Sequence, residues 1–173
     1  MQQLEFRAVK LSDIPQLVNL INSAYRQNLG KSWASESHIV VGARIQQPNN
    51  QLLIAEIQDC DQKTIIACIG LTYLHLEFEI GTFCIAPHWQ NQGIGKRFLA
   101  YAENHSKKYA KQHPTELSYY VMWVLNVCDE LIAYYECRGY VRTGEIEAYP
   151  VDANVGQPIV DLHLIKMKKI IVI

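Results

Sequence analysis

The segment HWQNQGIGKRF, residues 88–98, combines residue types that can bind an anion. Gly93 and Gly95 let the backbone curl tightly, and they lack the Cβ atoms that would keep a bulky phosphate at a distance. A helical pattern follows at once, and the first turn of a helix carries unpaired N–H groups and a partial positive charge. Lys96 and Arg97 add full positive charges, which are unfavourable at a helix N-terminus unless an anion binds there. The segment therefore predicts an anion site, and residues 90–96 are called the glycine turn below.

Two common nucleotide-binding motifs do not fit the glycine turn. A P-loop requires GxxxxGK[ST], but Gln90 replaces its first glycine and Arg97 replaces the Ser or Thr that holds magnesium. A dinucleotide-binding fingerprint requires a third glycine, and Phe98 occupies that place. A nucleotide-binding protein is therefore the least favoured of the functions considered.

The composition is typical of a folded protein, and its net charge is close to zero. The chain has 173 residues, of which 49% are hydrophobic and 19% charged, and its formal net charge is −1. This length predicts one domain, residues 1–173, and the charge gives no reason to expect nucleic acid or an anionic membrane as a partner. No apolar run has membrane-spanning length, and the start MQQLEFRAVK lacks the apolar core of a signal peptide. We expect a cytoplasmic protein.

The cysteines and histidines do not form a recognisable metal motif. The number of cysteines, five, is odd, and no two of them form a CxxC motif. None of the six histidines belongs to an HExxH motif or lies at zinc-binding spacing from a cysteine. No metal site is expected. Cys84 could in principle carry an acyl group, but no motif places a histidine to activate it, so a covalent mechanism is disfavoured.

The elements that position the glycine turn follow from the hydrophobic periodicity. It predicts strands at 4–9, 52–57, 64–74, 77–85, 118–127, 140–149 and 159–167, and helices at 94–110 and 129–137. Two further helices are expected to be capped by Ser12 and Ser35, and Gly81 is a candidate bulge position. The order βααβββαβαββ describes an α/β domain with a mixed sheet and helices on both faces.

Two segments carry a resemblance to a known family. Residues 79–98 resemble the acetyl-CoA motif of the GNAT N-acetyltransferases, Q/R-x-x-G-x-G/A after a strand that ends in a V-x-P-like step, here Ile85-Ala86-Pro87. LIAYYECRGY, residues 131–140, is similar to the family's A-x-x-L-Y-E-K-x-G-F segment. With the opening strand and helix, the resemblance covers most of the chain. It implies the GNAT-like acyl-CoA N-acyltransferase fold, an α/β fold with a mixed, centrally splayed sheet flanked by helices.

The resemblance also implies the co-substrate acetyl-CoA and the residues that bind it. The pyrophosphate of coenzyme A would lie on the amides of residues 92–96, and the pantetheine arm would pair with the backbone of residues 83–85. The implied cofactor-binding residues are Phe83, Cys84, Ile85, Gln90, Asn91, Gln92, Gly93, Ile94, Gly95, Lys96, Arg97 and Cys128. Cys128 is a departure, because the family often has an asparagine there, and the nearby Asn126 is out of register.

Acetyl transfer from a thioester to an amine requires two proton movements. For the acid that protonates the leaving thiolate, the resemblance implies Tyr135, whereas Tyr134 occupies a usually apolar position and is expected to pack. For the base we favour Glu79, a carboxylate in the apolar run FEIGTFCI where desolvation would raise its pKa. Glu77 shares its strand face, so either carboxylate, directly or through a water, can take the role.

The acceptor is expected to be a primary amine of a small molecule, a protein N-terminus or a lysine. Tyr25, Trp33 and Glu77 are candidates for lining its site. A non-catalytic acyl-CoA-binding sensor or interaction module with the same fold is the alternative function. The apolar C-terminal residues IIVI could cover a sheet edge in a homodimer.

Overall fold

Strands and helices follow one another in the order that the hydrophobic pattern predicts. The computed structural model describes residues 3–29, 45–59, 62–112, 119–150 and 160–172. The predicted bounds lie within a few residues of those observed, and the helix expected after Ser35 lies outside the described residues. The elements are β1 (Gln3–Ala8), η1 (Leu11–Asp13), α1 (Ile14–Leu29), β2 (Asn50–Asp59), β3 (Gln62–Leu74), β4 (Glu77–Ile85), η2 (Pro87–Trp89), α3 (Ile94–Gln112), β5 (Tyr119–Leu125), α4 (Asp129–Glu136), β6 (Val141–Ala148) and β7 (His163–Ile170).

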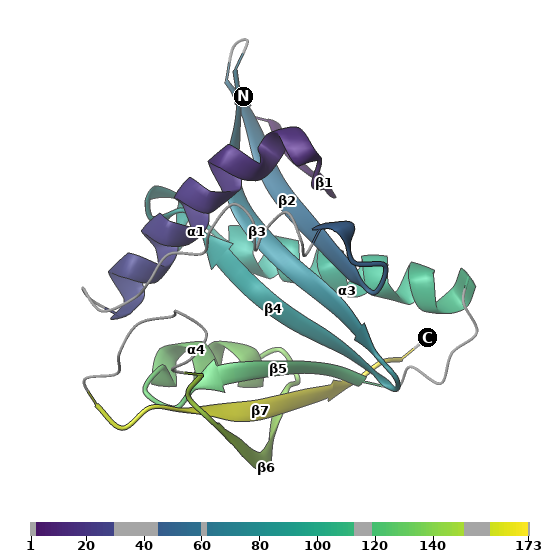
Figure 1. Ribbon diagram of the computed structural model, residues 1–173, viewed down its shortest axis with the longest axis vertical. Helices are drawn as coiled ribbons and strands as arrows, with labels where there is room; N and C mark the ends of the chain where they lie inside the picture. Colours follow the sequence, from purple (N-terminus) through teal and green to yellow (C-terminus); the bar gives the residue numbers. More distant parts are fainter. Residues whose placement is uncertain (1–2, 30–44, 60–61, 113–118, 151–159, 173) are drawn as a thin grey trace.

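The strands form a mixed sheet in the order β1-β2-β3-β4-β5-β7-β6. Each neighbouring pair is antiparallel except β4 and β5. The register of this parallel pair runs only from Glu77–Tyr119 to Glu79–Val121. Figure 1 shows β4 and β5 leaving a common end and diverging, which confirms the splay expected in the centre of the sheet.

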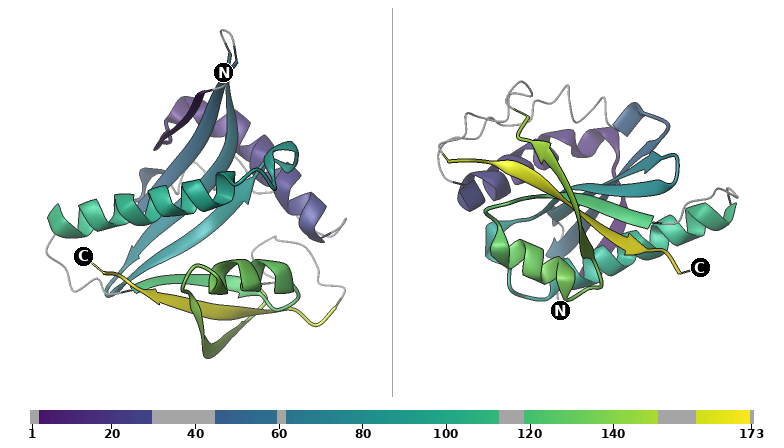
Figure 2. Two further views of the ribbon diagram at one scale, coloured as in Figure 1. Left: turned by 180° about the vertical axis from the view of Figure 1, so that it is seen from behind. Right: turned by 90° about the horizontal axis from the view of Figure 1, so that it is seen from below.

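Helices cover both faces of the sheet (Figures 1 and 2). On one face, α1 packs its apolar stripe against β2, β3 and β4. On the other face, α3 and α4 lie over the larger core, to which β5 and β7 also contribute. The buried residues of α3 are Ile94, Phe98, Leu99, Ala102, Ser106 and Ala110. Because Ile94 is the first of them, burial begins at the N-terminus of α3 and holds the glycine turn against the sheet.

A bulge in β4 changes which face its side chains occupy. Opposite β3 the register passes from Cys68–Cys84 to Gly70–Gly81, and Thr82 has a φ of 49°. Before this point Phe78 lies in the core under α3, whereas Cys84 lies on the opposite face with α1. The irregularity therefore involves Thr82, next to the candidate position Gly81, and it resets the alternation of the strand.

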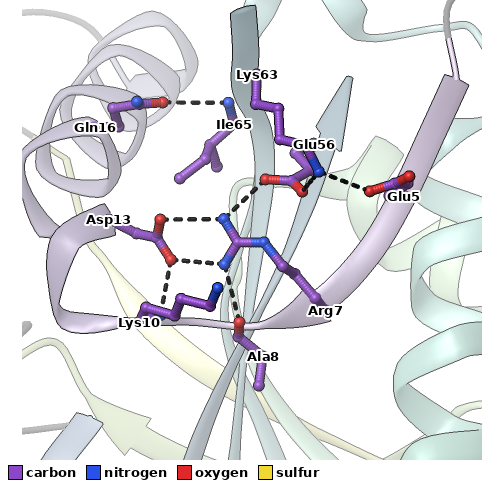
Figure 3. Close-up of polar contacts among 9 residues, drawn as sticks. All are labelled: Glu5, Arg7, Ala8, Lys10, Asp13, Gln16, Glu56, Lys63 and Ile65. Carbon is purple, nitrogen blue, oxygen red and sulfur yellow. Dashed lines mark hydrogen bonds and ion pairs between the residues drawn. The ribbon is translucent and has the colours of Figure 1, made fainter. Parts of the chain in front are cut away.

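A network of charged side chains ties the N-terminal elements together (Figure 3). Glu56, which is 2% exposed, accepts hydrogen bonds from Arg7 at 2.8 Å and from Lys63 at 3.0 Å. Arg7 also pairs with Asp13 at 2.7 Å, and Lys63 with Glu5 at 3.0 Å. These five residues, the Arg7 cluster, link β1, η1, β2 and β3. The hydrogen bonds from Arg7 hold the pKa values of Asp13 and Glu56 below their usual range.

The start of α1 differs from the prediction that Ser12 is its cap. Ser12 lies within η1, and α1 begins at Ile14. The carboxylate of Asp13 instead accepts a hydrogen bond from the backbone N–H of Lys10 at 2.7 Å. The cap prediction was wrong because a 3₁₀ turn begins at Leu11, so Ser12 already lies inside it and Lys10 occupies the N-cap position.

Candidate active site

The glycine turn presents backbone N–H groups at the N-terminus of α3. Its reversal uses positive φ values of 60° at Asn91 and 75° at Gly93. Arg97 donates its N–H to the carbonyl of Gly93 at 3.3 Å, so the N–H groups of residues 94–96 precede that bond. A Cβ atom at Gly93 would meet nothing within 4 Å, so the turn is open on this side. Lys96 and Arg97 are exposed and make no ion pair within the described part of the chain.

Side-chain amides hold the glycine turn in place. Gln90 donates from Nε2 to the carbonyl of Ile85 at 3.1 Å, and Gln92 donates to the carbonyl of His88 at 3.0 Å. Gln90, which is expected to bind the cofactor, therefore also links the end of β4 to the glycine turn through this hydrogen bond.

Gly95 allows α3, β4 and α4 to meet. A Cβ atom there would lie 3.0 Å from Cδ1 of Ile85, 3.2 Å from the hydroxyl oxygen of Tyr134 and 3.8 Å from Cζ of Phe83. The first two distances are tighter than ordinary van der Waals contact. The two glycines thus have different roles, because Gly93 faces open space whereas Gly95 removes a collision with Tyr134 and Ile85.

Beyond Glu79, β4 no longer pairs with β5, so this part of its edge borders the splay between the two strands. The N–H of Ala86 donates to the carbonyl of Ile66 on β3 at 2.7 Å. Since successive backbone groups of a strand alternate in direction, those of Ile85 and Phe83 point away from β3. Pairing with β5 ends at Glu79–Val121, so these groups lie beyond the paired segment.

The two carboxylates of β4 lie on one face, as their spacing predicts. Phe78 between them is buried in the core under α3, so Glu77 and Glu79 face the other side of the sheet. Glu77 lies 3.4 Å from Nζ of Lys166 and 3.5 Å from Nζ of Lys168. Glu79 is the last β4 residue that pairs with β5, which places it where the strands separate.

The two tyrosines of α4 differ in their surroundings. Tyr135 is 4% exposed and makes edge-on ring contacts with Tyr134 and Tyr140, at centroid distances of 5.3 and 5.8 Å. Burial raises the pKa of its phenol well above the usual value. Tyr134 is less buried as a whole, but its hydroxyl oxygen is buried and has no hydrogen-bond partner among the described residues.

Arg138 fixes Tyr134 from the next turn of the chain. Its guanidinium carbon lies 3.3 Å from the centre of the Tyr134 ring, and Nη1 donates to the Tyr134 carbonyl at 2.5 Å. Burial raises the pKa of the Tyr134 phenol, and the charge of Arg138 offsets part of that rise. The prediction that Tyr134 only packs misses this arrangement. The signals in the sequence are a tyrosine at a usually apolar position and an arginine four residues later.

The loop before α4 does not restore the family asparagine. Cys128 is the N-cap residue of α4, and burial raises the pKa of its thiol. Asn126 turns to β7 instead, where it donates to the carbonyl of Asp161 at 3.1 Å and accepts from the N–H of His163 at 3.0 Å. Asn126 is thus a brace at the start of β7.

Two candidate acceptor residues are not placed. Trp33 and the side chain of Tyr25 lie outside the described part of the chain.

In the described segments, no group of three His, Cys, Asp or Glu side chains could hold a metal ion. No helix within those segments has the length and apolar character that crossing a membrane requires.

Comparisons with known structures agree with this architecture. The ribosomal-protein-S18-alanine N-acetyltransferase of Escherichia coli is similar over 99% of this chain and 96% of its own, with a TM-score of 0.73 and 15% identity. The spermidine N-acetyltransferase of Vibrio cholerae, in complex with CoA and spermine, matches over 98% and 96%, with a TM-score of 0.71 and 19% identity. The IAA acetyltransferase of Bacillus cereus matches over 97% and 99%, with a TM-score of 0.69 and 18% identity. These likenesses show a shared fold.

The sequence comparisons identify the family. No curated protein sequence matches this chain significantly. The family model of the acetyltransferase (GNAT) domain matches residues 48–142, which is more than half of the chain and includes β4 and the glycine turn. The chain belongs to the GNAT family of acetyltransferases.

Proposed function

We propose that this protein transfers the acetyl group of acetyl-CoA directly to a primary amine. The observation that carries the proposal is the glycine turn, which lies at the end of β4 beside the splay and combines unpaired N–H groups with the charges of Lys96 and Arg97. Acetyl-CoA supplies an acetyl group activated as a thioester. The named neighbours include a spermidine and a ribosomal-protein acetyltransferase, so the fold accommodates both small and protein acceptors. We propose that the acceptor of this protein is a primary amine, the chemical group that small-molecule and protein acceptors share.

The chain offers a group for each part of coenzyme A. The amides of residues 92–96 bind the pyrophosphate, and the open side of Gly93 gives it room. The pantetheine arm pairs with the backbone of residues 83–85, where the carbonyl of Ile85 also accepts a hydrogen bond from Gln90. Cys128, whose raised pKa keeps it a neutral thiol, is a weak donor where the family often has an amide.

Two side chains are proposed to move the protons. Glu79, directly or through a water, takes the proton of the acceptor amine, since it lies where β4 and β5 separate. Glu77 is the second candidate, since it lies two residues farther from the point where β4 and β5 separate. Tyr135 donates the proton to the leaving thiolate, and its raised pKa makes this contribution modest. We propose Tyr25 and Trp33 as acceptor contacts.

Burial of Tyr135 favours a second candidate function, an acyl-CoA sensor that performs no transfer. An acceptor screen with acetyl-CoA separates the two, with release of free thiol measured optically and binding of coenzyme A by calorimetry. Acceptor-dependent thiol release supports the transferase. Binding of coenzyme A without release, across amino acids, polyamines and peptide N-termini, supports the sensor, and loss of both contradicts the coenzyme A site.

A further inference from the structure

We propose that the Tyr134 hydroxyl donates a hydrogen bond to the pantetheine arm of coenzyme A, and so positions it. This inference rests on the proposed function. The first support is location: the hydroxyl oxygen lies 3.2 Å from where a Cβ atom of Gly95 would be, and the other neighbours of that point are Ile85 and Phe83. These are the β4 residues beside which the pantetheine arm is proposed to pair, so the hydroxyl lies among the residues that would surround that arm.

The second support is the cost of the hydroxyl itself. A buried hydroxyl without a partner destabilises a fold, and a phenylalanine would fill the same space without that cost. The Tyr134 oxygen and Nε of Arg138 are buried, and neither makes a hydrogen bond of good geometry in the described residues. The guanidinium of Arg138 does interact with the phenol, but from the face of the ring, 3.3 Å from its centre. Two such atoms on neighbouring side chains favour a polar partner at the edge of the junction of α3, β4 and α4, which the hydroxyl reaches by turning away from Gly95.

The third support is the chemistry of the phenol. Burial raises its pKa, so it stays protonated and can donate at neutral pH. Arg138 stacks on the ring at 3.3 Å and is anchored to the Tyr134 carbonyl, which holds the ring in one orientation. A fixed neutral donor suits a carbonyl oxygen of the pantetheine amides. The pyrophosphate is expected at the open side of Gly93 instead.

Tyr73 provides a matched control. Its hydroxyl is likewise buried without a partner in the described segments, but it lies among the rings of Phe78 and Tyr109, at 4.4 and 4.0 Å between centroids. An isolated hydroxyl alone therefore does not identify a binding group. Its place beside Gly95 distinguishes Tyr134.

The experiment compares Tyr134→Phe, Tyr73→Phe and wild type by calorimetry with coenzyme A and with ADP, and by thermal unfolding. Both variants should unfold at the wild-type temperature or above it without ligand. Only Tyr134→Phe should bind coenzyme A more weakly, by about five- to tenfold, the usual contribution of one hydrogen bond. Its affinity for ADP, which lacks the pantetheine arm, should not change.

The other possible outcomes contradict either the contact between Tyr134 and the pantetheine arm or the proposed function. Equal loss of affinity for ADP and coenzyme A would place the contact on the pyrophosphate and overturn the pantetheine assignment. A lower unfolding temperature of the unliganded Tyr134→Phe protein with unchanged coenzyme A affinity would show a purely structural hydroxyl. If wild type itself does not bind coenzyme A, the proposed function fails, whereas unchanged binding by the variant refutes this inference alone.

Discussion

Two regions of the molecule bury polar atoms in opposite ways. In the Arg7 cluster the buried carboxylate of Glu56 meets two cations, and Arg7 meets two carboxylates. Beside the glycine turn, the buried hydroxyl of Tyr134 has no partner within the described residues. Since an unsatisfied buried group costs stability, we expect the first region to hold the fold together and propose that the second receives a ligand. Substitutions in the two regions should therefore separate stability from binding.

The largest effect on stability is expected from Arg7→Met. Its loss leaves Asp13 without its guanidinium partner and Glu56, at 2% exposure, with Lys63 alone. Breaking a buried pair by removing one partner costs about 3–5 kcal/mol, and we expect the lower end because Lys63 remains. Chemical denaturation measures the loss. Lys63→Met, which removes a half-exposed lysine, is the control and should cost much less.

The coenzyme A affinity of a folded Arg7→Met sample should equal that of wild type. A large loss of affinity would show that the Arg7 cluster and the cofactor site are coupled, and the division into a stability region and a binding region would be wrong.

The largest effect on activity is expected from Glu79→Gln. The substitution keeps the size and hydrogen-bonding capacity but removes the basicity, and a general base contributes roughly 10²–10⁴ in rate. With a verified acceptor, kcat/KM at neutral pH should fall by that order, and part of the loss should return at higher pH as more amine becomes neutral. Glu77→Gln is the matched control on the same strand face and should change the rate much less. The reverse result would assign the base to Glu77.

Gly95→Ala tests the crowding between α3 and α4. The new Cβ atom would lie 3.0 Å from Ile85 and 3.2 Å from the Tyr134 oxygen, so overpacking should cost about 1–3 kcal/mol of stability. In a Tyr134→Phe background the oxygen is absent, and the same change should cost at least about 0.5 kcal/mol less. Gly93→Ala is the control. It strains a φ of 75° but fills open space, so its cost should not depend on Tyr134. Additive costs for Gly95→Ala and Tyr134→Phe would contradict the contact.

The sequence predicts the elements well because periodicity and glycine are local signals. The strands around the splay and the glycine turn follow from such signals. Gly81 marks the bulge in β4, but the positive φ of 49° falls on the next residue, Thr82, a residue type that rarely adopts it. The 3₁₀ turn before α1 is missed as well, since it leaves no distinct pattern in the sequence.

The chemistry of the site is less predictable because it depends on distant contacts. The lysines that contact Glu77 come from β7, about ninety residues later in the chain. The contact between Tyr134 and Gly95 joins two helices, and no spacing within either segment encodes it. The family motif identifies where coenzyme A is expected, whereas the partners that adjust each side chain require the fold.

The smallest expected effect is the acid dependence of the Arg7 cluster. In the folded chain the pKa of Asp13 is lowered by its hydrogen bonds from Arg7, below the ordinary value near 3.8. Between these two values the unfolded chain binds more protons than the folded chain, so the free energy of unfolding decreases as the pH falls through that window. Above it, the stabilisation is complete, and wild type should show no contribution of Asp13 to the pH dependence between about pH 5 and 7.

Asp13→Asn removes this titration and keeps the shape of the side chain. The variant should be less stable at neutral pH, and the difference from wild type should shrink below about pH 4, as the wild-type carboxylate becomes protonated. Denaturant titrations across this range, with Tyr134→Phe as the comparison, measure the effect. Since a phenol is fully protonated throughout the range, the difference between Tyr134→Phe and wild type should stay constant with pH. A constant difference for Asp13→Asn as well would mean that Arg7 stabilises this end of the sheet by packing rather than by charge.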